Sequence, residues 1–358
     1  MKKLNHKKLI IFLLSSLLLV SSALLAQKPS RRGTTAANFL EIGYGCRGNA
    51  MGDAVVSVVN DLSSVYWNPA GLALMRQSGV QFVYQPWIAD INTSFAAAGL
   101  VLPNLGTFAV GYYQVDYGRE EVTTMEMQDG TGEHYAANDY CLSLSYGRSL
   151  AQWFAFGAST KFIASTIWHT NAYAFAFDLG VMVNTGFFSS TENRMDGLSI
   201  GMSIANYGTK MRYDGMDLLQ PIDPTPYTAG EYDNVEGQYR TLGWELPLIF
   251  RIGMALHPLV TNYQRLTLEI DALHPNNNVE SVNIGGEYEF TLPAFGSFYL
   301  RGGYKALFME HSEYGPAFGT GVILRMASLN NMAVRLDYAY RDVGILGTNH
   351  AYSLSLMF

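Results

Sequence analysis

The histidines are the side chains in this sequence best suited to acid–base chemistry. Hydrolysis of an ester or a lipid would need one of them beside a serine nucleophile and a carboxylate. Six histidines follow the first thirty residues: His134, His169, His257, His274, His311 and His350. They scatter over predicted loops and strand ends, and only His257 falls on the hidden face of a strand, with no serine assigned beside it. We therefore expect no catalytic site.

Metal, cofactor and nucleic-acid binding are also disfavoured. The chain lacks Cys, His, Asp and Glu at the local spacing of a metal site, and its glycines lie within predicted strands rather than in a phosphate-binding loop. A net charge of −7 provides no basic face for nucleic acid. Only Cys46 and Cys141 are present, and in an oxidising compartment they could form one bridge or remain two buried thiols.

The first 26 residues have the pattern of a secretory signal peptide. Four lysines between positions 2 and 8 precede an apolar run from Leu9 to Val20, and small residues follow this run. An uncleaved anchor is the alternative, but the run is shorter than the ~20 residues that span a bilayer. We expect cleavage after Ala23 or Ala26 and export of the mature chain.

The composition of the exported chain is that of a membrane barrel. Beyond the signal peptide, no window offers eighteen uninterrupted apolar residues, so helical spans are not expected. Aromatic residues make up 13% and charged residues 15% of the sequence, and there are 35 glycines. Charge is low against the ~25% of an average soluble domain. An exported, aromatic-rich chain without helical spans indicates an all-β transmembrane antiparallel barrel in a Gram-negative outer membrane, in contact with its lipid.

Alternation of apolar and small or polar residues supports this fold. About fourteen segments alternate: 79–86, 93–102, 106–117, 138–149, 152–167, 172–184, 196–206, 245–257, 264–274, 278–291, 296–307, 316–327, 331–342 and 347–358. An even number places both barrel ends on the same side. The predicted periplasmic turns are 102–106, 149–152, 184–197 and 327–331, and the predicted extracellular loops are 118–137 and 207–243.

The hidden faces of these segments carry a sparse set of charges. A soluble sandwich also alternates, but its polar face meets water and should be rich in Lys and Glu. The predicted lumen-facing charges are Asp178, Arg251, Glu269, Asp271, Glu287, Glu289, Arg301, Lys305, Arg335 and Asp337. Glu287 and Arg301 lie on neighbouring strands, as do Arg325 and Arg335 with Asp337 nearby, so we expect cross-strand pairs that brace the wall.

The residues between the signal peptide and the first strand do not alternate. Residues 50–59 suit a short helix or a buried small-residue segment, and Asn68-Pro69-Ala70-Gly71 has the composition of a turn. The lumen of a fourteen-stranded barrel is too wide for wall side chains to fill. We therefore divide the chain into a signal peptide (1–26), an N-terminal plug or hatch (27–78) and the barrel (79–358).

This N-terminal segment closely resembles that of the PorV/PorQ-like outer-membrane proteins. The family pattern is an F-L-x-I stretch, then A-R-x-x-A-M-G-x-A, then D-x-x-x-x-Y-W-N-P-A-G-L. The matching residues are Arg47, Ala50, Met51, Gly52, Ala54, Asp61, Tyr66, Trp67, Asn68, Pro69, Ala70, Gly71 and Leu72. Cys46 departs from the family's alanine. The resemblance continues in IANYGTKMRY, YLRGGYK and the closing strand, and so covers nearly all of the mature chain.

The resemblance implies a FadL-like fold with an N-terminal hatch and two alternative functions. One is an accessory role in type IX secretion, as a docking or shuttle protein whose partners are translocon components or cargo. The other is transport of small hydrophobic compounds across the outer membrane. A transporter needs a continuous apolar path, whereas a docking barrel can be fully packed.

The ending AYSLSLMF reads as the strand that closes the barrel. One face is apolar and aromatic, and the other carries Ser353 and Ser355. We expect this strand to pair with the first one and so remove the open edge. A terminal aromatic strand also resembles the signal read by the outer-membrane assembly machinery. The residues of that signal are Tyr352, Leu354, Leu356 and Phe358.

Overall fold

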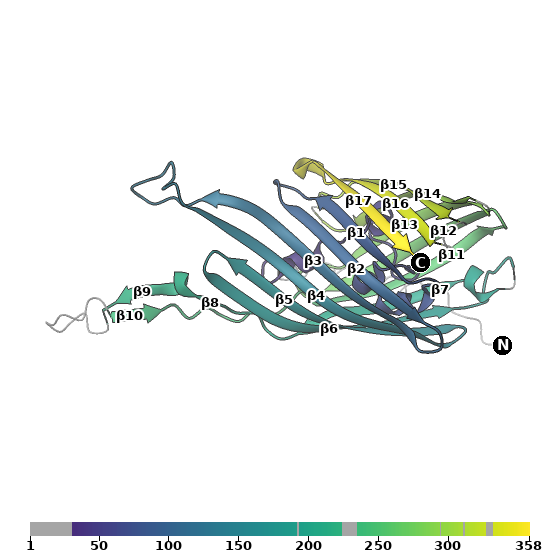
Figure 1. The fold of residues 1–358 in the computed structure, drawn as a ribbon, viewed down its shortest axis with the longest axis horizontal. Helices are drawn as coiled ribbons and strands as arrows, with labels where there is room; N and C mark the ends of the chain where they lie inside the picture. The colour runs from purple at the N-terminus through teal and green to yellow at the C-terminus, as the bar shows by residue number, and fades with distance from the viewer. Residues whose placement is uncertain (1–30, 192, 224–234, 294, 311, 327–331) are drawn as a thin grey trace, which may run out of the picture.

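A closed antiparallel barrel of fourteen strands is the core of the structure (Figure 1). The computed structural model describes residues 31–191, 193–223, 235–293, 295–310, 312–326 and 332–358. The predicted signal peptide and the predicted turn 327–331 lie outside the described residues. The barrel confirms the fold class expected from the alternation of side chains.

The strands follow the predicted segments closely. They are β1 (Gly79–Pro86), β2 (Asn92–Leu102), β3 (Gly106–Glu121), β4 (His134–Ala151), β5 (Phe154–Ile167), β6 (Thr170–Asn184), β7 (Ser199–Gly208), β11 (Ile249–Val260), β12 (Gln264–Pro275), β13 (Ser281–Leu292), β14 (Gly296–Leu307), β15 (Pro316–Met326), β16 (Met332–Asp342) and β17 (Thr348–Met357). Each strand pairs with its neighbours in chain order, with β7 next to β11. Strand boundaries differ from the predictions by a few residues.

The last strand closes the barrel against the first. β17 pairs with β1 in a register that runs from Gly79 opposite Met357 to Tyr84 opposite Tyr352. The backbone N–H of Phe358 donates to the carbonyl of Ser78 at 2.9 Å. Because every strand of the ring has two partners, no edge is left unpaired in the membrane.

Side chains alternate across the barrel wall. On β4 and β6 the apolar side chains point outward, with Leu144 57% and Phe175 59% exposed, whereas Ser143 and Ala174 are buried. The outward residues would face lipid, and the buried ones line the lumen. On β17, Tyr352 and Leu354 are exposed while Ser353 and Ser355 are buried.

One end of the barrel carries the long connections. β3 and β4 extend beyond the predicted strands, so the loop expected over 118–137 shortens to 122–133. The region 207–243 contains β8 (Tyr213–Gly215), which pairs with β6, and a separate hairpin of β9 (Leu219–Ile222) and β10 (Val235–Gln238). Figure 1 shows both hairpins reaching away from the barrel at the same end. The connections at the opposite end are shorter turns, apart from the β6–β7 connection over 185–198. We therefore take the end with the projecting hairpins as extracellular and the opposite end as periplasmic.

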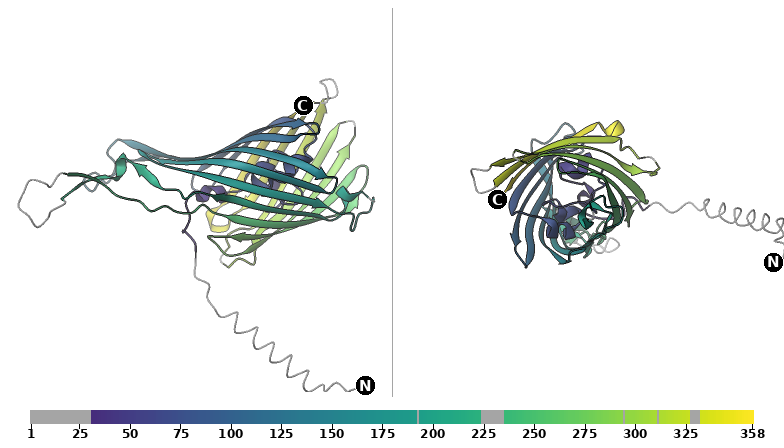
Figure 2. Two further views of the ribbon diagram at one scale, coloured as in Figure 1. Left: turned by 90° about the horizontal axis from the view of Figure 1, so that it is seen from below. Right: turned by 90° about the vertical axis from the view of Figure 1, so that its right-hand side faces the viewer.

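The residues between Asn38 and Met75 lie within the barrel (Figure 2). Their helical turns are η1 (Asn38–Glu41), α2 (Cys46–Ala50), α3 (Ser64–Trp67) and η2 (Pro69–Leu74), and we call residues 38–75 the inner segment. Of the two alternatives for residues 50–59, the buried small-residue segment forms rather than the helix, because α2 ends at Ala50 and the residues after it follow a buried, turn-rich path. Short turns η3 (Arg194–Asp196), η4 (Met216–Leu218) and η5 (Gly344–Leu346) lie in connections. In the described part of the chain, no helix is long and apolar enough to cross a membrane.

Replacing Phe358 by Asp tests the predicted role of the closing strand in assembly. Phe358 is 56% exposed at the end of the chain, so an aspartate there would not disturb the packing of the lumen. We expect Phe358→Asp to reduce the amount of heat-modifiable, folded barrel in outer-membrane fractions, and Phe358→Tyr to leave it unchanged. Equal outer-membrane levels of the Asp variant and the unaltered protein would contradict an assembly role.

Candidate functional site

Asn68 holds the turn between α3 and η2 against the barrel wall. Its side-chain carbonyl accepts from the backbone N–H of Ala70 at 3.1 Å. Its amide donates to the carbonyl of Val56 at 2.8 Å and to that of Val181 on β6 at 3.1 Å. Pro69 begins η2, where its missing N–H is not needed. The Asn-Pro-Ala-Gly sequence is therefore a structural joint between the inner segment and the wall.

Glycines in the wall make room for this turn. A Cβ at Gly157 on β5 would lie 2.2 Å from the carbonyl carbon of Pro69, and one at Gly180 on β6 would lie 2.0 Å from Asn68 Oδ1. Both distances are far below van der Waals contact. The wall and the motif are thus shaped for each other at the level of single methyl groups.

A second close approach lies on the opposite side of the lumen. Gly52 has a φ of +64°, and a Cβ there would meet the backbone N of Tyr304 at 2.5 Å. Glycines of the wall face Met51, the residue before Gly52. A Cβ at Gly303 would lie 2.2 Å from the carbonyl carbon of Met51. Gly285 on β13 stands in the same relation to Met51. Only glycine allows this backbone to touch β13 and β14.

Asp53, the residue after this contact, anchors the segment by charge. Its carboxylate accepts from Arg341 on β16 and lies 2.7 Å from the ammonium of Lys305 on β14. Burial alone would raise the pKa of Asp53, but Arg341 and Lys305 more than offset it and hold the pKa below its usual value. The contribution of Asp53 to the stability of the folded protein is therefore present above the pKa that this carboxyl has in the unfolded chain. It is lost as the pH falls through the pKa of Asp53 in the folded protein.

Two wall carboxylates bind the backbone of the inner segment directly. Asp271 Oδ2 accepts from the N–H groups of Val55 at 2.9 Å and Val56 at 3.1 Å. Glu269 accepts from the N–H of Ser57 at 2.7 Å and from its hydroxyl at 2.8 Å. These backbone N–H groups have no acceptor in a helix or sheet. The two carboxylates therefore provide hydrogen-bond acceptors for donors that would otherwise be buried and unpaired.

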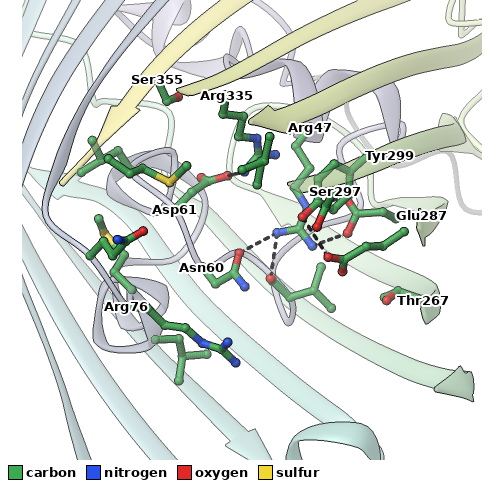
Figure 3. Close-up of a pocket in the computed structure, with 18 of the residues that line it drawn as sticks. Arg47, Asn60, Asp61, Arg76, Thr267, Glu287, Ser297, Tyr299, Arg335 and Ser355 are labelled. Carbon is green, nitrogen blue, oxygen red and sulfur yellow. Dashed lines mark hydrogen bonds and ion pairs between the residues drawn. The ribbon is translucent and has the colours of Figure 1, made fainter. Parts of the chain in front are cut away.

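A chain of ion pairs joins two points of the inner segment to three strands, and Figure 3 shows its Arg47–Glu287 contact. The contacts are Arg47–Glu287 (2.7 Å), Glu287–Arg301 (2.7 Å), Arg301–Asp337 (2.7 Å), Asp337–Arg335 (2.7 Å) and Arg335–Asp61 (3.2 Å). Arg47 and Asp61 belong to the inner segment, and the others to β13, β14 and β16. Three guanidinium groups meet three carboxylates, so the cluster carries no net charge.

Aromatic rings fill the centre of the lumen. Tyr44 stacks on Phe95 with 4.0 Å between ring centroids, and it also contacts Tyr66 at 4.5 Å. The guanidinium of Arg251 on β11 lies 5.3 Å from the Tyr66 ring and 5.8 Å from that of Trp67. Arg251 forms no ion pair with a described residue, and its contacts with the rings are of the cation–π kind.

A cavity of about 680 Å³ lies at the periplasmic end, below the inner segment. Arg47, Asp61, Glu287 and Arg335 form part of its wall, as Figure 3 shows. His257 also lines it, with Nδ1 3.1 Å from the hydroxyl of Thr267. No serine bonds to this histidine in the described structure.

Most of the charges named from the sequence meet the inner segment or one another. Asp178 pairs with Lys161 at 2.6 Å, while Glu289 is partly buried and accepts from the hydroxyl of Tyr299 at 3.0 Å. The sequence patterns did not single out Lys161 or Asp53. Lys161 lies an even number of residues after Gly157 on β5, so the alternation of side chains places both on the inward face. Asp53 directly follows the Met-Gly pair of the family motif. Both residues could therefore have been identified from the sequence.

Two side-chain pairings considered from the sequence do not form between the described residues. Arg325 does not join the expected ladder, because Arg335 lies opposite Ile323 and Arg325 lies opposite Ala333. Cys46 and Cys141 are both free and buried, so the bridge does not form. Cys46 instead contacts the carbonyl of Asp337 at 3.4 Å.

Comparison with known proteins identifies the family. The model of the type IX secretion system protein PorV matches residues 25–246, which include the inner segment and half of the barrel strands. The chain belongs to the PorV family. A PorV-type protein is an outer-membrane β-barrel associated with type IX secretion. A search of curated proteins returned no match.

Solved structures with a similar fold include a FadL homologue and two toluene transporters. The chain is similar to a FadL homologue from Pseudomonas aeruginosa, with 11% identity and a TM-score of 0.51 over 88% of this chain and 98% of that one. It is also similar to the toluene transporter TodX from Pseudomonas putida, with 10% identity and a TM-score of 0.53 over 88% and 97%. The toluene transporter TbuX from Ralstonia pickettii gives 10% identity and 0.52 over the same shares. At such identities the likeness concerns the fold alone.

Replacing Gly180 by Val tests the fit between wall and segment. Its side chain would overlap Asn68 Oδ1, and overpacking of this kind costs about 1–3 kcal/mol. We expect a lower midpoint of thermal unfolding and new maleimide labelling of the buried thiols in the folded barrel, measured by mass spectrometry. Gly186→Val is the matched control, because a Cβ at Gly186 has no neighbour within 4 Å. An unlabelled Gly180→Val protein with an unchanged midpoint would refute the steric account.

Proposed function

We propose that this barrel is an accessory component of type IX secretion that docks or shuttles secreted cargo, and that it does not conduct solutes. Family membership supports the secretion role. The observation that carries the proposal is the inner segment, whose backbone and charged side chains bond to β12, β13 and β16 on one side and to β6 on the other. A segment held on several sides is suited to act as a fixed plug.

We also propose that the chain is processed on export and has two parts in its mature form. Residues 1–26 act as a signal peptide that is removed on export, residues 27–78 as the plug and residues 79–358 as the barrel. The partners are cargo proteins and translocon components at the rims, and no catalytic step is included.

The extracellular end supplies a surface for docking. The tip of the β3–β4 hairpin carries Met125, which is 95% exposed, and Met127, which is 53% exposed. Ile222 and Val235 are exposed on the neighbouring β9–β10 hairpin. Apolar side chains in water at projecting tips favour contact with another protein, and adaptable methionines suit a series of different cargoes.

A FadL-like transporter of small hydrophobic compounds is the second candidate. The fold shared with toluene transporters favours it. Such a channel needs a continuous apolar path, however, and the cavity below the inner segment is lined by the paired charges Arg47–Glu287 and Arg335–Asp61. A solute without polar groups would displace water from these charges without giving them new partners, and this costs free energy.

Deletion of the gene, followed by parallel assays, separates the two candidates. We expect loss of type IX cargo from the medium and unchanged uptake of a labelled fatty acid. Complementation with a Met125→Asp, Met127→Asp variant should restore export only partly. The matched control is Phe187→Asp, Phe188→Asp, an exposed apolar pair at the opposite rim, which should restore it fully. Normal cargo export in the deletion strain would exclude the docking role.

A further inference from the structure

The cavity at the periplasmic end is bounded by both parts of the chain. Arg47 and residues 57–58, 60–62 and 74–77 of the N-terminal region contribute to its lining, and the ends of the barrel strands form most of the remaining wall. Its volume of about 680 Å³ falls within the ~300–1,000 Å³ of ligand-binding sites. Because the docking surface described above lies at the other end, this cavity needs a separate explanation.

The cavity has more cationic than anionic groups available to a ligand. Five arginines line the cavity. Three of them are already paired: Arg47 with Glu287, Arg265 with Asp196 and Arg335 with Asp61. Arg76 and Arg325 also line it, are exposed, and form no hydrogen bond or ion pair through their side chains with any described residue. The remaining carboxylate, Glu289, already accepts from two hydroxyl groups. An anionic ligand would therefore find two free guanidinium groups.

His257 adds a buried polar group to the same wall. Its side chain is 6% exposed, and its Nδ1 is occupied by the hydroxyl of Thr267. Nε2 has no partner among the described residues and is left for a group inside the cavity. A polar atom without a partner in the wall of a cavity is available to hydrogen-bond a bound ligand.

The apolar part of the lining indicates what carries the anionic group. Four methionines line the cavity: Met75, Met182, Met195 and Met357. Methionine contacts adapt to irregular apolar side chains, whereas a free phosphate would use only the arginines. Membrane lipid is separated from the cavity by the closed wall of paired strands. We propose that this cavity binds an acidic and apolar peptide segment of a periplasmic partner protein.

Peptide binding to the full-length barrel in detergent micelles tests this site. The probes are a fluorescein-labelled hexapeptide of alternating leucine and aspartate and its leucine–asparagine counterpart. We expect fluorescence anisotropy to show binding of the acidic peptide that is about tenfold tighter than that of the neutral one, since charge-assisted hydrogen bonds to arginine are lost with the carboxylates. The double variant Arg76→Ala, Arg325→Ala should weaken acidic-peptide binding by about tenfold and reduce its dependence on salt.

Controls keep the result specific to the cavity. Arg119→Ala removes an exposed arginine at the opposite rim and should leave binding unchanged, and heat-modifiability confirms that each variant is folded. Equal affinity for the two peptides, or no effect of the double variant, would overturn the proposal. Displacement of the peptide by millimolar inorganic phosphate would also overturn it, because it would identify a site for a small anion. Export of type IX cargo is measured separately and does not affect this outcome.

Discussion

The pairing of charges between the inner segment and the wall is the interaction on which the rest of this structure depends. Arg47 and Asp61 are connected through Glu287, Arg301, Asp337 and Arg335 into one neutral cluster. An unpaired charge in a buried lumen would cost several kcal/mol. Without the segment, Arg341 and Lys305 would lose Asp53, and the wall carboxylates that accept from its backbone would lose their donors. Without the wall, Arg47 and Asp61 would lose their ion-pair partners. Each part is therefore complete only in the presence of the other.

Steric fit determines where the charged groups can meet. The inner segment touches the wall backbone over Gly157 and Gly180 on one side and over Gly285 and Gly303 on the other. These contacts fix the position of the segment, and the ion pairs and the N–H bonds to Asp271 and Glu269 then have short, directed geometry. Part of the high glycine content is thus a consequence of a filled lumen.

Much of the fold could be predicted because a membrane barrel imposes a strict period. Lipid outside and a packed lumen inside require alternation, so the strands and the inward charges could be read directly from the sequence. The extension of β3 and β4 past the predicted strand ends could not, since residues 118–121 are all exposed and residues 134–137 do not alternate in burial.

The contacts of the inner segment were harder to predict than the strands. Lys161 lies on an inward face, but nothing local indicates that Asp178 on the next strand is its partner. Asp53 depends on a left-handed turn at Gly52 that directs it toward Arg341 and Lys305. The cavity and its free arginines arise only when strand ends far apart in sequence are brought together. The motif resemblance identified the family from residue types at a known spacing, and that spacing does not show which contacts the residues make.

Hydrogen exchange at the backbone amides of Val55, Val56 and Ser57 tests most directly whether the segment is fixed in the lumen. These N–H groups bond to Asp271 and Glu269. The account predicts exchange as slow as that of the barrel strands, because opening would break the ion pairs and expose the carboxylates together. Exchange as fast as that of the exposed loop 122–133 would contradict it and would show that the segment leaves the wall readily.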